Sequence, residues 1–176
     1  MGRATVRTAV TTYFQNANLP MVGTVFSSRP AIVSEDDYET SLANAALAYV
    51  GSASGSSAVI MVNLTESKRT RHSLTGRGAV ADFTIHDIEL EVILANTASD
   101  AIAAQQDHDT LVDAITSTLR ADPLLGAPQQ IWSAGEFSAG VTVRQSSPFT
   151  GSDGQTVFVL AIVAFQAWED IEGPVI

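Results

Sequence analysis

The hydrophobic positions along the chain follow two spacings, one typical of helices and one typical of strands. In residues 3–17, apolar side chains recur at three- and four-residue intervals, which predicts an amphipathic helix. A second helix is expected over 34–49, where Ser34 would cap the first turn. A third is expected over 99–121, and it ends before Pro123.

Other runs of apolar residues predict strands. The segments 58–64 and 156–168 are apolar on both alternating faces, which indicates interior strands that are covered on two sides. Further strands are expected over 23–29, 130–137 and 141–146, with a turn before the last long strand. This order of elements predicts an α+β fold, a single domain with a mixed or antiparallel β-sheet and helices packed against it.

The segment 79–94 also alternates, but its phase changes. Phe83 and Ile85 are odd-numbered, whereas the later residues of the pattern are even-numbered: Ile88, Leu90, Val92 and Leu94. Successive side chains of a strand point to opposite faces, so burying both sets requires an extra residue. We therefore predict a β-bulge or a bend near His86 and Asp87.

Three stretches are too polar or too rich in glycine and serine to bury much surface. The sequence GSASGSS predicts a flexible loop near 51–57, and a polar, basic stretch predicts another near 66–78. The second stretch continues the strand 58–64, and we expect it to be a hairpin arm or a loop that stands away from the core. The C-terminal tail, 170–176, is expected to be loose.

Composition narrows the class of protein. The chain has 176 residues, enough for one domain, and it is 45% hydrophobic and 16% charged, which excludes a disordered chain. The absence of cysteine removes thiolate metal sites and disulfide frameworks. The N-terminus does not resemble a signal peptide, and the longest apolar run, 157–165, is about half the length of a membrane helix. We expect a soluble, intracellular protein.

The net charge is −10, which argues against a general affinity for phosphate backbones. Four of the nine basic residues nevertheless lie in one segment: Lys68, Arg69, Arg71 and Arg77. No aromatic residue in this segment could stack on a base. Two interpretations remain open, a solvated hairpin and an interface that attracts an acidic copy of the same chain.

Acidic residues concentrate in the segment 79–94, where Asp87, Glu89 and Glu91 project to one side of the predicted strand. Three carboxylates in a row could bind a hard cation or serve acid/base chemistry. The alternation favours the wet face of an antiparallel sheet instead. A third reading is that this face lines a pore or meets a basic neighbour.

Motifs that carry catalysis are incomplete. The glycine-serine segment reads GSASG and has Ala53 where a hydrolase would place its nucleophilic serine. The glycines at 76 and 78 lack the Lys-Ser/Thr sequel of a phosphate-binding loop. The residues 107–109 (DHD) are interpreted as a solvated helix face. We therefore predict no catalytic, cofactor-binding or metal-ligating residues and no bound cofactor, and we do not expect an enzyme.

The order of these segments resembles the tail terminator family of long-tailed (siphovirus-type) bacteriophages. The resemblance covers most of the chain. It is carried by the N-terminal helix RATVRTAVTTYF, the strands AVIMVNL and FTIHDIELEVIL, the helix segment DHDTLVDAITSTLRADPLLG and the closing strand TVFVLAIVAFQAWE.

This resemblance implies a virion protein assembled in the host cytoplasm as a ring, a hexamer in that family, at the head-proximal end of the tail. The ring would stop growth of the tail tube and offer a surface for head-tail joining. Its partners would be copies of itself, the tail tube protein and the head-tail connector, while DNA passes through the lumen without specific binding. The seven charged residues named above are the candidate interface or lumen residues. The alternatives are another neck, tail-completion or tail-tube subunit, or an enzyme that uses Asp87, Glu89 and Glu91.

Overall fold

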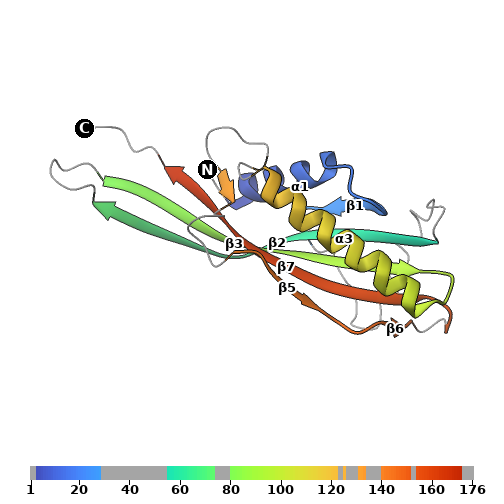
Figure 1. Cartoon of the computed structure of the whole chain (residues 1–176). Helices are drawn as coiled ribbons and strands as arrows, with labels where there is room; N and C mark the ends of the chain where they lie inside the picture. Colours follow the sequence, from blue (N-terminus) through green and yellow to red (C-terminus); the bar gives the residue numbers. More distant parts are fainter. Residues whose placement is uncertain are drawn as a thin grey trace.

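The structure is a computed structural model, and it combines two described helices with a long, twisted sheet (Figure 1). It describes residues 3–28, 55–73, 80–122, 125, 131–133, 140–151 and 154–171. In chain order the elements are α1 (Arg3–Asn16), β1 (Val22–Phe26), β2 (Ser56–Ser73), β3 (Val80–Asn96), α3 (Ala101–Ala121), β4 (Ile131–Ser133), β5 (Thr142–Gln145), β6 (Phe149–Thr150) and β7 (Val157–Ile171).

The seven described strands form one sheet. Five of them lie side by side in the order β1-β2-β3-β7-β4. The short strands β5 and β6 also pair with β7, on the side away from β3. β1 runs parallel to β2, and every other pair is antiparallel. The predicted α+β class with a mixed sheet is therefore confirmed.

The strand predictions are largely confirmed. β2 and β7 are interior strands along their apolar halves, as their two-sided hydrophobic pattern indicated. β4 occupies three residues of the predicted strand 130–137, and residues 134–139 lie outside the described part. The turn predicted before the last long strand contains the two-residue strand β6.

Both described helices follow their hydrophobic spacing. α1 buries Val6, Val10 and Phe14 on one face. α3 begins after Asp100, whose carboxylate accepts from the backbone N–H groups of Ile102 and Ala103 at 3.0 Å. Such a cap satisfies N–H groups that have no partner within the helix. The predicted helix over 34–49 lies outside the described residues.

The helices α1 and α3 cover one face of the sheet, and the main core lies between them and that face (Figure 1). Tyr13 Oη of α1 donates to the carbonyl of Thr118 in α3 at 3.0 Å, which ties the two helices together. A smaller apolar cluster lies on the opposite face. It consists of Val59, Met61, Ile93, Ala95 and Phe158.

A β-bulge is present near the predicted place, but in a different strand. The pairing of β2 with β3 shifts between Leu64 and Glu66, so that Thr65 is the extra residue. β3 itself pairs with β7 without interruption. The prediction of an extra residue at His86 and Asp87 is therefore wrong, because His86 is buried on the same face as Ile88 and continues the alternation of β3.

Beyond the bulge the sheet continues past the helices as β2, β3 and the end of β7, and β4 pairs with β7 along residues 167–169 (Figure 1). We call this part, residues 66–73, 80–87 and 167–171, the arm. The prediction of a hairpin arm is confirmed, but the predicted loop over 66–78 is wrong for residues 66–73, which are paired in β2. Residues 74–79 lie outside the described part.

The other two predicted loose segments are also partly ordered. In the segment 51–57, Ser56 and Ser57 begin β2 and are buried, so the loop prediction is wrong for them. In the tail, Asp170 and Ile171 pair with β3, so the prediction is wrong at its first two residues. Both segments otherwise lie outside the described residues, apart from Gly55, whose φ of +75° suits glycine.

Candidate functional site

The acidic row of β3 lies on the face of the sheet opposite α1 and α3. The residues between the carboxylates, such as Ile88 and Leu90, belong to the main core under the helices. Alternation then directs Asp87, Glu89 and Glu91 to the other face. Asp87 and Glu89 are half-buried, but Glu91 is only 7% exposed. The wet-face interpretation therefore fits the first two residues and is wrong for Glu91.

Each carboxylate contacts a different neighbour. Gln166 Nε2 of β7 donates to Asp87 Oδ1 at 2.8 Å. Asn63 Nδ2 of β2 donates to Glu91 Oε2 at 3.4 Å. The contacts therefore tie β3 to two adjacent strands instead of converging on one point.

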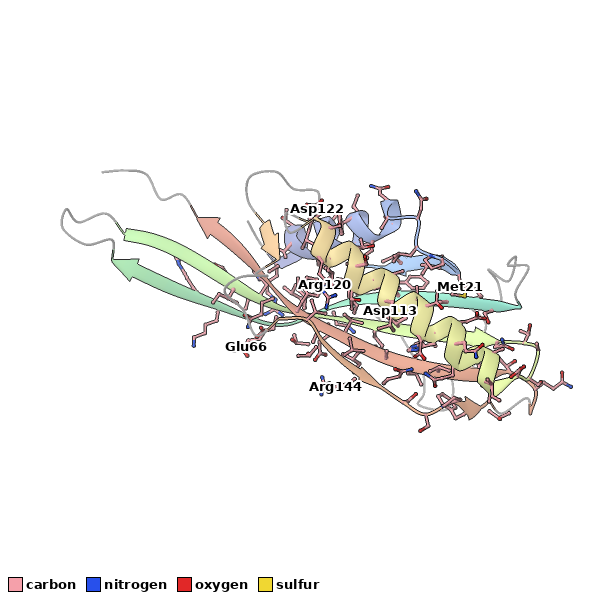
Figure 2. All side chains as sticks on the ribbon, viewed as in Figure 1. Met21, Glu66, Asp113, Arg120, Asp122 and Arg144 are labelled. Carbon is pink, nitrogen blue, oxygen red and sulfur yellow. The ribbon has the colours of Figure 1, made fainter. Side chains whose placement is uncertain are left out.

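The third carboxylate forms an ion pair with the short strand β5. Arg144 Nη2 lies 3.1 Å from Glu89 Oε1, and the two side chains are 69% and 31% exposed. Figure 2 shows Arg144 and Glu66 on the side of the sheet away from α3. Within the described residues, no three His, Cys, Asp or Glu side chains come close enough to hold a metal ion.

The four basic residues predicted from sequence are partly described. Lys68 and Arg69 are exposed on β2, in the arm. Arg71 occupies the β2 position opposite Asp82 of β3, and its side chain lies outside the described set, as does the whole of Arg77. The structure therefore places three of the four on one strand.

A buried polar cluster that the sequence did not reveal joins α3 to the sheet. Ser56 Oγ of β2 donates to Asp107 Oδ2 of α3 at 2.5 Å and accepts from Asn96 Nδ2 of β3 at 2.9 Å. Ser56 and Asn96 are at most 1% exposed. Full burial of this hydroxyl indicates a structural contact and not an accessible nucleophile.

His108 of α3 is fully buried, so the prediction of a solvated face at 107–109 is wrong for this residue. Its Nδ1 accepts from Gln145 Nε2 of β5 at 3.0 Å, and the same Nε2 lies 3.0 Å from Asp109 Oδ1. Its Nε2 is buried without a hydrogen-bond partner among the described residues. Helical spacing indicates that His108 is buried, because it lies four residues after the buried Ala104 on the same face of α3.

These contacts shift two pKa values. Burial lowers the pKa of His108 below its usual value, and the nearby Asp109 carboxylate opposes part of that change. Hydrogen bonds from Gln145 and then Gln105 lower the pKa of Asp109. The neutral imidazole and the ionised carboxylate are thus the forms that hold β5 against α3.

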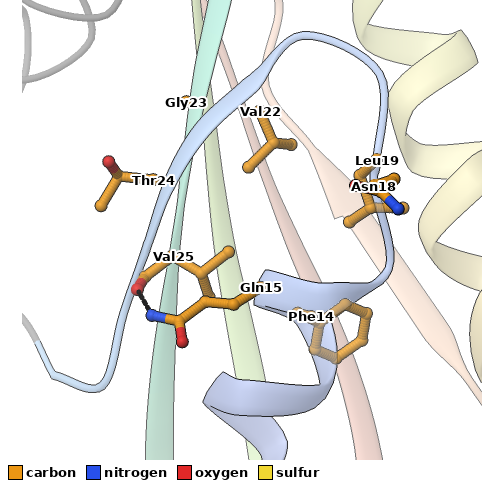
Figure 3. Close-up of a pocket in the computed structure, with 8 residues that line it drawn as sticks. All are labelled: Phe14, Gln15, Asn18, Leu19, Val22, Gly23, Thr24 and Val25. Atoms are coloured by element: carbon orange, nitrogen blue, oxygen red, sulfur yellow. Dashed lines mark hydrogen bonds between the residues drawn. The ribbon is translucent and has the colours of Figure 1, made fainter.

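Two of the surface pockets are lined by described residues. One, of about 390 Å³, lies between the end of α1 and β1, where Gln15 Nε2 donates to the carbonyl of Val25 at 3.1 Å (Figure 3). Phe14 and Val22 add apolar surface to its lining. The other, of about 310 Å³, lies beside the bulge and is lined in part by Asp87 and Glu89.

No protein-family model matches the sequence, and no curated protein matches it. No helix in the described part of the chain combines the length and apolarity that crossing a membrane requires. Among solved structures, the chain is similar to a chain of the virion of a native gene transfer agent (GTA) particle, with a TM-score of 0.36 and 13% sequence identity over 94% of this chain and 95% of that one.

Proposed function

We propose that this chain is a structural virion protein that forms a ring on the head-proximal end of a phage tail tube. The ring ends polymerisation of the tube and provides the surface for head-tail joining. Its partners are copies of itself, the tail tube protein and the head-tail connector. The order of helices and strands, which resembles that of tail terminators, supports this assignment.

The observation that carries the proposal is the arm. β2, β3 and β7 contain 18, 17 and 15 residues, about three times the usual length of a strand. Only their first or last halves lie under α1 and α3 (Figure 1). A sheet that extends past its helical cover leaves strand edges and faces available to neighbouring subunits.

The acidic face of the sheet supports a position along the path of DNA. Glu66 and Asp87 lie on the face opposite the helices, where Glu89 is paired with the exposed Arg144, and like charge prevents DNA from sticking to a channel wall. Lys68 is also exposed in the arm, so the negative charge is concentrated nearer the bulge. In the proposed ring, this face lines the lumen.

The function we propose is not enzymatic. The three carboxylates that could have served acid/base chemistry each contact a different strand, through Gln166, Arg144 and Asn63. Such contacts favour a role in holding the sheet together. A neck or tail-completion subunit of the same particle, or a tube subunit, is the alternative within the same class.

Mixing the purified chain with tail tubes of its own phage tests the proposal by negative-stain microscopy. A terminator forms a ring at one end of each tube and prevents further growth when tube subunits are added. A tube subunit instead polymerises alone into long tubes. Tubes that bear no added density and continue to grow would show that the proposed function is wrong.

Loss of the polypeptide provides a second test. A phage that lacks it should produce tails of irregular length that do not join heads, and expression of the chain in trans should restore them. Infectious particles of normal tail length in its absence would contradict the proposal.

A further inference from the structure

The pocket of about 390 Å³ at the end of α1 has an apolar floor and a neutral rim. Phe14 and Val25 are buried beneath it. Leu19 and Val22 are only partly buried, so they contribute exposed apolar surface to its lining. Among its described lining residues, none carries a charge. Such a lining suits an uncharged aliphatic side chain and not an ion.

The same pocket borders a strand that is paired on one side. In the described part of the chain, β1 pairs only with β2. Gln15 Nε2 donates to the carbonyl of Val25, so the end of α1 and β1 form two walls of one groove (Figure 3). Peptides commonly bind in this way, as an extended segment beside a strand with side chains in adjoining pockets. The groove therefore fits an extended segment that carries aliphatic side chains.

The residues that follow the described part of β7 have this character. Residues 172–176 read EGPVI, and we call them the end segment. Pro174 restricts Gly173 to an extended conformation. The β-branched side chains of Val175 and Ile176 favour the same conformation. The sequence therefore offers two aliphatic side chains on an extended segment.

The end segment is too short to reach the pocket of its own chain. Pairing across the sheet places Val22 of β1 level with Val159 of β7. Ile171, where the described part of β7 ends, lies about 40 Å from that level at the usual rise of a strand (Figure 1). A segment of this length spans at most about 18 Å when fully extended. Only the end segment of another copy can therefore enter the pocket.

We propose that the end segment of one copy docks in the pocket between α1 and β1 of the neighbouring copy in the ring. The inference rests on the proposed function, because the ring provides that neighbour. Since the end segment follows the arm, the contact ties the arm of each subunit to the next subunit. It removes Val175 and Ile176 from water, and burial of two such side chains is large enough to affect assembly.

The absence of cysteine from the chain allows a direct test of the contact. Full-length Ile176→Cys is mixed with full-length Gln15→Cys, which places a thiol at the rim of the pocket, and the mixture is oxidised. Thr8→Cys replaces Gln15→Cys in the control, because Thr8 is exposed about two turns earlier on the same helix. Mass spectrometry identifies the disulfides that join the two kinds of chain.

Docking should give at least about tenfold more of these mixed disulfides with Gln15→Cys than with Thr8→Cys, because a bound segment raises the local concentration of its thiol. Thermal unfolding checks that each variant folds.

A second test changes the apolar character of the end segment. Ile176→Asp should raise the concentration needed for half-maximal ring assembly at least about tenfold, because the pocket offers no partner for a charge. Ile102→Asp is the matched control, since Ile102 is 72% exposed on α3 and the change adds the same charge. Sedimentation velocity and negative-stain images follow ring formation with and without tail tubes.

Equal yields of mixed disulfide at positions 15 and 8 would overturn the docking contact and leave the proposed ring intact. Rings of Ile176→Asp that form at the wild-type concentration would overturn it as well. If those rings form but fail to bind tail tubes, the end segment contacts the tube protein instead of a second copy. Mixed disulfides at position 15 from a chain that forms no ring on tail tubes would overturn the proposed function and keep the contact.

Discussion

Arg3 and Leu64 meet at the point where the sheet leaves its helical cover. Arg3 Nη2, at the start of α1, donates to the carbonyl of Leu64 at 2.8 Å. Leu64 is the last residue of β2 before the bulge, and Thr65 Oγ1 donates to the carbonyl of Asp87 in β3 at 3.2 Å. Two side chains therefore satisfy carbonyls where the ladder is interrupted, and they help to set the direction of the arm.

Replacing Arg3 with methionine should loosen this junction. The change removes a charged donor from the Leu64 carbonyl and should lower the free energy of unfolding by about 1 kcal/mol. Hydrogen exchange should increase at residues 64–66 and remain unchanged in α3. Thr12→Met, at an exposed position of the same helix, is the matched control. Equal exchange in the two variants would show that Arg3 does not hold the bulge.

Ser56 and Ser57 offer a sharper comparison, because they are adjacent and both buried. Ser56→Ala removes the contacts to Asp107 and Asn96 and should lower the free energy of unfolding by about 2 kcal/mol. Ser57 Oγ has no hydrogen-bond partner among the described residues, so Ser57→Ala should leave stability unchanged or slightly higher. Urea unfolding measures both. A similar loss in the two variants would mean that the hydroxyl contacts contribute little.

Sequence spacing predicted the two described helices well because each of them buries one continuous stripe. The predicted helix over 3–17 is α1 to within one residue at its end, and that over 99–121 begins two residues early because Asp100 caps it from outside. The charges on either side of His108 predict a solvated face, which is wrong for His108 because it lies on the buried stripe of α3. A histidine on a buried stripe needs a polar partner, and Gln145, 37 residues away, supplies it.

The arm could be predicted only in part. The polar residues at 66–73 predict exposure, which is correct for Lys68 and Arg69. The prediction of a loop is wrong because the sequence of one segment does not show that it pairs with another strand. The bulge was placed in β3 because a phase change does not reveal which strand carries the extra residue. Which residues lie opposite one another in the arm depends on register, which follows from the fold and not from local composition.

Acid should destabilise the protein through His108. Burial lowers the pKa of His108 in the folded state below its ordinary value of 6.5, so the unfolded chain binds the proton first as pH falls. This contribution is therefore absent above about pH 6.5, and below it the free energy of unfolding decreases until the lowered folded pKa is reached.

Unfolding in urea at pH 7.5 and pH 5.5 measures this effect. His108→Leu should lose less stability between the two values than the wild type does, because it has no imidazole to protonate. Asp109 does not contribute to this difference, because it titrates in a lower pH range. Its pKa is lowered in the folded state, so the stability it contributes is lost only as pH falls below about 3.8. Identical losses in wild type and variant between pH 7.5 and 5.5 would contradict the role of His108.

Divalent cations should leave the acidic row unaffected. Gln166, Arg144 and Asn63 already engage its carboxylates from three different strands, so no shared set of ligands faces one point. Millimolar magnesium or calcium should therefore produce no heat of binding in calorimetry and no rise in the thermal midpoint. A saturable heat of binding that disappears in Asp87→Asn would favour the metal-dependent alternative.

Deleting Thr65 tests whether the bend of the arm matters for assembly. Leu64 pairs with Ile88 and Glu66 with Asp87, so removing the residue between them leaves a regular antiparallel ladder. The variant should therefore fold, with a change in stability of about 1 kcal/mol or less. A bulge increases local twist, so its removal re-aims the arm relative to α1 and α3. If the arm joins subunits, the deletion should abolish rings while the monomer stays folded, which sedimentation velocity and thermal unfolding measure together. Thr65→Ala is the control, because it keeps the bulge and should retain the rings. Rings of normal size in the deletion variant would show that assembly does not depend on the direction of the arm.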